Sequence, residues 1–175
     1  MVRFDFQEMP STITVWSDAD FAGCRRARRS TSGGVVTLGR HCVKTYSLTQ
    51  ETIALSSGES EFYGIVKAAT QGLGVRGLLL DMGLEMELRV NTDSSAAKSI
   101  ASRRGCGKVR HLETRELWLQ EKVARGEVEI RKVRGEENVA DVLTKRVSRE
   151  ILDRHMAATG HERRYGRHPL SPVLG

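Results

Sequence analysis

Long apolar runs are absent from this chain of 175 residues. The most apolar helix-like stretch, LGVRGLLLDMGL, is interrupted by Arg76 and Asp81 and is too short to span a membrane. The first ten residues, MVRFDFQEMP, lack the apolar core of a signal peptide. We therefore expect neither membrane insertion nor secretion.

Paired cysteines and aromatic residues are also scarce. Cys24, Cys42 and Cys106 are far apart and odd in number, and no C-x-x-C pair occurs. This spacing argues against a zinc site or a disulfide framework and predicts a reducing, intracellular location, without separating nucleus from cytoplasm. Aromatic residues make up 5% of the chain, which indicates that it has no aromatic platform for stacking bases.

What the chain does contain is an ordinary share of apolar residues and an excess of basic ones. The composition is 39% hydrophobic and 29% charged, as in soluble globular proteins, and the length suits one domain with a sizeable core. The net charge of +6 and the sequence pI near 9.5 predict an anionic partner, most commonly nucleic acid.

The alternation of apolar and turn residues predicts strands first and then strands mixed with helices. This order is typical of an α/β protein with a mixed sheet flanked by helices. The expected strands cover 13–17, 34–40, 41–48, 88–92 and 127–133, and the expected helices start near 57 and 96 and cover 109–125 and 139–145. We expect 1–11 to be a leader or remnant, 12–147 the domain, and 148–175 a basic, partly disordered tail.

Four carboxylates fall where these elements change. Asp18 ends the first strand, Glu61 lies in the first turns of the long helix, Asp93 follows the fourth strand, and Asp141 opens the last helix. Asp18 and Asp93 would meet if their strands are parallel neighbours. Such a cluster repels itself unless cations fill it, and oxygen ligands suit Mg²⁺ or Mn²⁺. Each acid alone is also compatible with a surface or helix-capping role.

Five segments around these acids resemble the ribonuclease H domain of copia-type retrotransposon polyproteins. They occur in the family's order and span roughly residues 13–147. The segments are SDADFAGCRRARRSTSG (17–33), ALSSGESEFYGI (54–65), VNTDSSAA (90–97), VRHLETRELWLQEKVARGEVE (109–129) and ENVADVLTK (137–145).

The resemblance implies a ribonuclease H-like fold that binds an RNA–DNA hybrid and cuts its RNA strand with two Mg²⁺ or Mn²⁺ ions. The matching positions for the metal carboxylates are Asp18, Glu61, Asp93 and Asp141. It also implies a polyprotein origin, with a reverse transcriptase polymerase region as a partner. No polymerase region precedes these segments, which predicts a fragment or a domesticated or degraded copy.

Residue spacing alone does not decide between Asp18 and Asp20, or between Glu59 and Glu61, as metal ligands. Asp18 and Asp20 share a strand face because side chains alternate with period two. Glu59 and Glu61 lie about 200° apart around a helix, so they cannot both face one site. The family resemblance favours Asp18, with Asp20 as its neighbour, and Glu61.

Basic residues and hydroxyls near the acids are the candidate substrate contacts. Phosphates attract arginine and accept hydrogen bonds from hydroxyls, and RNA is told from DNA at the 2′-OH. The candidates are Arg28, Arg29, Ser30, Ser32, Ser57 and Ser95. A second basic run contains Arg103, Arg104, Lys108 and Arg110.

One departure leaves an alternative function open. The loop VRGEENVAD, before the last aspartate, lacks the histidine that many cellular ribonucleases H carry there, and His111 is interpreted as a structural or substrate contact. The alternative is a non-catalytic module of the same fold that binds nucleic acid or associates with a reverse transcriptase. A DNA-directed two-metal nuclease, such as an integrase core, fits less well because it generally uses three acids.

Overall fold

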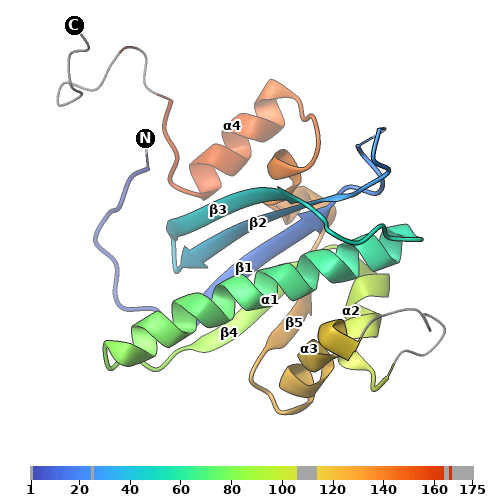
Figure 1. The fold of residues 1–175 in the computed structure, drawn as a ribbon. Coiled ribbons are helices and arrows are strands. Elements are labelled where there is room, and N and C mark those ends of the chain that lie inside the picture. Colours follow the sequence, from blue (N-terminus) through green and yellow to red (C-terminus); the bar gives the residue numbers. More distant parts are fainter. Residues whose placement is uncertain (1, 25, 106–113, 164–165, 167–175) are drawn as a thin grey trace, which may run out of the picture.

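The structure is a computed structural model that describes residues 2–24, 26–105, 114–163 and 166. Its sheet has five strands in the order β3-β2-β1-β4-β5 (Figure 1). The strands are β1 (Thr12–Ala19), β2 (Thr31–Leu38), β3 (His41–Thr49), β4 (Glu87–Thr92) and β5 (Glu129–Lys132). The helices are α1 (Ser57–Asp81), α2 (Ser95–Ser102), α3 (Thr114–Ala124) and α4 (Arg149–Ala158).

The sheet is mixed, as the sequence predicts. β1 pairs antiparallel with β2, and β2 pairs antiparallel with β3 through a tight turn at Gly39, whose φ is +56°. β1 pairs in parallel with β4, and β4 in parallel with β5. The predicted α/β mixed five-stranded sheet is therefore confirmed. Parallel pairing places the carboxyl ends of β1 and β4 at the same edge.

One face of the sheet is covered by α1, with α2 and α3 at the β4–β5 side (Figure 1). Ile13 and Val15 of β1 are fully buried there with Phe62 and Ile65 of α1. Each such side chain contributes about 1.5–3 kcal/mol by leaving water. Gly72 lets helix and sheet approach closely, because a Cβ at this position would lie 2.4 Å from Leu88 Cδ1.

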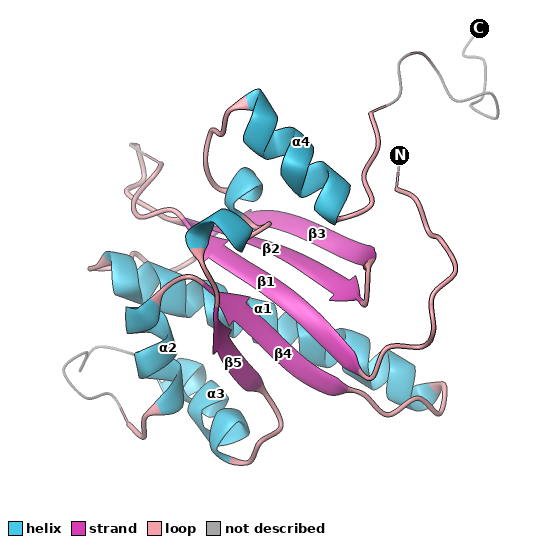
Figure 2. Ribbon diagram, turned by 180° about the vertical axis from the view of Figure 1, so that it is seen from behind, coloured by secondary structure: helices cyan, strands magenta, loops and turns pink. Residues whose placement is uncertain are grey.

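The opposite face is only partly covered. Figure 2 shows β1, β4 and β5 exposed toward the viewer, with α4 lying beyond β2 and β3. A small second core contains Val35, Cys42 and Val139, against which Trp16 and Leu143 pack. The part of the sheet formed by β1, β4 and β5 carries no α-helix on this side among the described residues.

The structure differs from the sequence predictions mainly at element ends. β2 begins at Thr31 instead of residue 34, inside the expected loop. The expected helix over 139–145 is a single 3₁₀ turn, Asp141–Leu143, and another 3₁₀ turn, Gly135–Glu137, precedes it. Asp141 therefore stands on a short turn with 3₁₀-type hydrogen bonds and not on an α-helix. The first part of the helix expected at 109–125 lies outside the described residues.

The expected tail contains an ordered helix. Ser148 caps α4, because its Oγ accepts a hydrogen bond from Ile151 N at 3.3 Å. His155 is buried on this helix. The expected leader lies against the helix end, where Arg3 N donates to Gly160 O at 2.8 Å. The first part of the expected tail is therefore helical over Arg149–Ala158, while the domain boundaries at 12 and 147 and the partial disorder of the tail stay predictions.

Candidate metal centre

Asp18, Asp93 and Asp141 converge at the carboxyl edge of β1 and β4. The register pairs Ser17 with Thr92, so the residues that follow them, Asp18 and Asp93, come to the same edge. One oxygen from each of the three aspartates lies within 4.8 Å of the others. Asp18 is fully buried, and Asp93 and Asp141 are half-buried. The site is a cluster of carboxylates that is open on one side.

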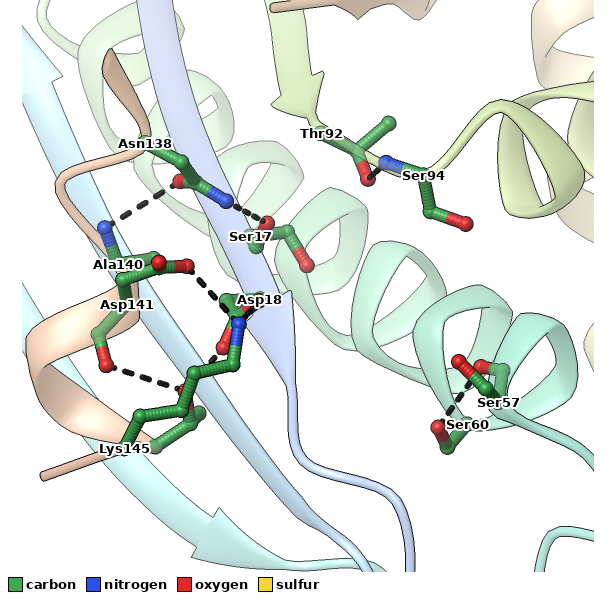
Figure 3. A network of polar contacts seen from close by, with 11 residues as sticks. Ser17, Asp18, Ser57, Ser60, Thr92, Ser94, Asn138, Ala140, Asp141 and Lys145 are labelled. Atoms are coloured by element: carbon green, nitrogen blue, oxygen red, sulfur yellow. Dashed lines mark hydrogen bonds and ion pairs between the residues drawn. The ribbon is translucent and has the colours of Figure 1, made fainter. Parts of the chain in front are cut away.

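Asp93 is fixed between a strand end and a helix start. Thr92 Oγ1 accepts a hydrogen bond from Ser94 N at 3.1 Å, and Ser94 Oγ accepts one from Ala97 N at 3.1 Å (Figure 3). Ser94 is therefore the cap of α2, which leaves the Asp93 carboxylate available to the site. Gly135 suits the neighbouring loop, because a Cβ there would lie 3.3 Å from Asp93 Oδ2.

Asp141 is positioned by Asn138, which precedes the expected helix over 139–145. Asn138 is fully buried, and its Nδ2 donates to Ser17 O at 2.9 Å. Its Oδ1 accepts from Ala140 N at 3.3 Å (Figure 3). One side chain therefore ties the segment that carries Asp141 to the strand that carries Asp18.

A lysine lies between two of the carboxylates. Lys145 Nζ is 3.0 Å from Asp18 Oδ1 and 3.2 Å from Asp141 Oδ1 (Figure 3). Burial lowers the pKa of Lys145, but attraction to Asp18 and Asp141 outweighs it and raises the pKa overall. Thr144 Oγ1 donates a further hydrogen bond to Asp18 Oδ2. Sequence analysis missed both residues, although they belong to the segment ENVADVLTK.

Glu61 approaches the three aspartates from α1. It is 8% exposed, and its Oε2 has no hydrogen-bond partner among the described residues. Burial raises the pKa of Glu61 to about 8, with repulsion from Asp18 and Asp93 adding to the rise. Burial also raises the pKa of Asp141 to about 6, with repulsion from Asp18 adding. The cluster thus holds more negative charge than Lys145 offsets.

Glu59 and Asp20, the two neighbours that spacing left open, have other partners. Glu59 Oε1 accepts a hydrogen bond from Tyr63 Oη at 2.6 Å, and its Oε2 accepts one from Leu55 N at 3.0 Å. Asp20 accepts a hydrogen bond from Thr31 N across the loop that leaves β1. These contacts fix the start of α1 and the loop after β1, which leaves Asp18 and Glu61 for the site.

The candidate substrate contacts divide into two groups. Ser30 and Ser32 are buried, and their hydroxyls accept hydrogen bonds from Ala22 N at 3.0 Å and Gln50 Nε2 at 2.9 Å. This placement favours a structural role for both serines. The exposed candidates are Arg28, Arg29, Ser57 and Ser95. Lys108, Arg110 and His111 lie outside the described residues.

The donor set fits hard divalent cations. The ligand atoms offered are carboxylate oxygens, which Mg²⁺ and Mn²⁺ prefer. A buried Glu61 oxygen without a partner and two raised carboxyl pKa values are what a carboxylate cluster shows when a cation is needed to balance it. The residues present are therefore suited to hold such ions.

This fold is the one found in ribonuclease H domains. The N-terminal RNase H domain of a Mycobacterium tuberculosis protein superposes with a TM-score of 0.54 at 16% identity, over 85% of this chain and 98% of that one. At this identity the likeness shows the fold alone. No family model matches the sequence.

Sequence relatives point to retrotransposons. A 140-residue stretch is 29% identical to the retrovirus-related Pol polyprotein from transposon TNT 1-94 of Nicotiana tabacum, covering 79% of this chain and 10% of that protein. The Pol polyprotein from transposon RE1 of Arabidopsis thaliana is 24% identical over 152 residues, which cover 85% of this chain and 10% of that protein. The chain thus spans about a tenth of the length of these relatives. The resemblance to a copia-type ribonuclease H domain is confirmed.

Proposed function

We propose that this chain hydrolyses the RNA strand of RNA–DNA hybrids, with two Mg²⁺ or Mn²⁺ ions as cofactors. The observation that carries the proposal is the convergence of Asp18, Asp93 and Asp141 within 4.8 Å at the strand edge of a ribonuclease H-like fold. The Pol polyprotein relatives support the same activity.

The chain's own residues have separable roles in this proposal. Asp18, Asp93 and Asp141 would hold the ions, and Glu61 would complete the set. When bound, such ions activate a water molecule and stabilise the leaving oxygen of a phosphodiester. Buried Asp18 gives the site a fixed edge, because Asn138 and Thr144 restrain the backbone and carboxylate around it. Lys145 neutralises the cluster and has to leave the oxygens that an ion takes.

The exposed basic and hydroxyl side chains would hold the substrate. Arg28 and Arg29 stand on the turn after β1 and would attract phosphates. Ser57 and Ser95 are exposed at the first turns of α1 and α2 and are the candidates for contact with the 2′-OH. The reverse transcriptase polymerase region is the proposed protein partner, since the relatives are Pol polyproteins.

Cleavage of an end-labelled RNA–DNA hybrid in Mg²⁺ and in Mn²⁺ tests the function. We expect cutting of the RNA strand, and a loss of at least about 100-fold in Asp93→Asn because a metal ligand is removed. Lys44→Ala, an exposed substitution on β3, is the control. Salt-sensitive hybrid binding without metal-dependent cutting would instead identify the chain as a non-catalytic module.

None of the described helices is long and apolar enough to cross a membrane.

A further inference from the structure

A cavity of about 760 Å³ lies on the face of the sheet that α1 does not cover, beside the metal centre. Its lining includes Trp16 of β1, Arg89 and Asn91 of β4, Arg131 of β5, and Asp93. We call it the sheet-face groove. Figure 2 shows this face with β1, β4 and β5 side by side and none of α1 to α4 over them.

The period of the strands explains which side chains line the groove. In β4, Leu88 and Val90 are buried against α1, so Arg89 and Asn91 point to the opposite face. In β5, Ile130 belongs to the core and Arg131 is exposed. Asp93 follows on the same face as Asn91, which makes the groove continuous with the metal centre.

The groove carries an excess of positive charge. Arg89, Arg131, Lys132 and Arg134 contribute four cations, against Asp93 and Glu137. Arg89 is paired with Glu129, with Nε 2.6 Å from Oε2. Arg131, Lys132 and Arg134 are exposed and have no ion-pair partner within the described part of the chain. Uncompensated arginines beside a carboxylate centre favour a bound polyanion.

The floor of the groove offers groups that could read a base. Asn91 is 5% exposed, and its Oδ1 has no hydrogen-bond partner among the described residues. Buried polar atoms are normally satisfied, so this acceptor is available to a donor from a ligand. Trp16 is half-buried beside it and supplies one aromatic surface, which the low aromatic content did not lead us to expect.

We propose that the sheet-face groove binds a single-stranded RNA segment that continues from the metal centre. The inference rests on the proposed function, because the strand cut at the centre is RNA. Phosphates would contact Arg131 and Arg134, and an unpaired base would approach Trp16 and Asn91. A base inside a duplex is stacked and cannot reach such a floor, so the strand has to be single at this point.

Fluorescence anisotropy with four hybrids tests the proposal. One is blunt, two carry a single-stranded RNA extension of about eight nucleotides at the 5′ or at the 3′ end of the RNA strand, and one carries a DNA extension of the same length. Titrations without divalent ions prevent cutting. We expect roughly tenfold tighter binding of one extended hybrid than of the blunt one, and a salt slope steeper by about 0.7 for each added phosphate contact.

The double variant Arg131→Ala, Arg134→Ala should bind the extended hybrid no more tightly than the blunt one, and its affinity for the blunt hybrid should be unchanged. Lys44→Ala, which removes an exposed cation from β3, should still bind the extended hybrid more tightly than the blunt one. The inference is overturned if neither extension tightens binding, if a DNA extension tightens it equally, or if Lys44→Ala loses as much as the double variant. Cleavage of the blunt hybrid in Mg²⁺, measured in parallel, reports separately on the proposed function.

Discussion

Lys145 Nζ lies 3.0 Å from Asp18 Oδ1, so an ammonium group occupies the edge of the carboxylate cluster. Its second contact, 3.2 Å to Asp141 Oδ1, bridges two of the three aspartates. A divalent cation that uses these oxygens has to displace the lysine. The lysine would therefore compete with a bound metal ion, and without a metal ion it stabilises the aspartates.

Replacing Lys145 by methionine should tighten metal binding. Removing a nearby positive charge favours a divalent cation by roughly 1 kcal/mol, or about fivefold in Kd. Isothermal titration with Mn²⁺ measures the change, and Lys44→Met is the matched control on exposed β3. The metal-free variant should also melt at a lower temperature than the wild type. Weaker Mn²⁺ binding by Lys145→Met would refute the competition.

The metal-free protein should lose stability as the pH rises toward 8. The pKa of Glu61 is raised from 4.5 to about 8 in the folded chain, chiefly by burial. The protonated acid therefore favours the folded state, an effect that is complete below about pH 4.5 and lost as the pH passes through 8. Thermal unfolding in chelator should shift by roughly 4 °C for each kcal/mol lost. Glu61→Gln should flatten this dependence.

Glu59→Gln and Glu61→Gln should differ in their effects on Mn²⁺ binding and on folding. Glu59 accepts hydrogen bonds from Tyr63 and Leu55, so Glu59→Gln should destabilise the fold by about 1–2 kcal/mol and leave Mn²⁺ affinity unchanged. Glu61→Gln should weaken Mn²⁺ binding and stabilise the metal-free chain at pH 8. Urea unfolding and Mn²⁺ titration of both variants distinguish the roles. A similar loss of Mn²⁺ affinity in the two variants would contradict the assignment.

Asn138→Ala should damage the fold and the metal centre together. The variant leaves Ser17 O and Ala140 N without their side-chain partner in a fully buried place, at a cost of about 2 kcal/mol. Because Asp141 follows on the freed segment, Mn²⁺ affinity should fall as well. Ser47→Ala removes an exposed hydrogen bond to Leu143 O in the same neighbourhood and should stay within about 0.5 kcal/mol of wild type. Unchanged Mn²⁺ affinity in folded Asn138→Ala would show that Asp141 is held by other contacts.

Strand and helix periodicity predicted the layout of the fold because most of its elements bury one face. The alternation in 88–92 and the helical spacing from Phe62 to Leu73 come directly from packing on the shared core. Helix α4 escaped prediction because it buries little apolar surface, and its single buried residue is His155. Asp141 was expected on a helix over 139–145, whereas a 3₁₀ turn tied by Asn138 forms instead.

The carboxylates of the site could be named from the sequence because the family resemblance marked them. The choice between Glu59 and Glu61 could not be made from spacing. It depends on which of the two carboxylates accepts the hydrogen bonds from Tyr63 and Leu55 at the start of α1. The burial of Ser30 and Ser32 could not be predicted from the sequence either. Their hydroxyls are used by Ala22 N and by Gln50, contacts that form only when the loop and β2 are folded together.

Val2 pairs with His161 and Arg3 with Gly160, so two segments that are far apart in the sequence lie side by side. These contacts lie near the turn that links β2 and β3, since Arg3, Arg40 and His161 line one cavity. Ile13 pairs with Leu38 at that end of β1, whereas Asp18 stands at the other end. Residues 2–3 and 160–161 therefore meet at one end of the sheet, and the carboxylates of Asp18, Asp93 and Asp141 lie at the opposite end, away from both segments.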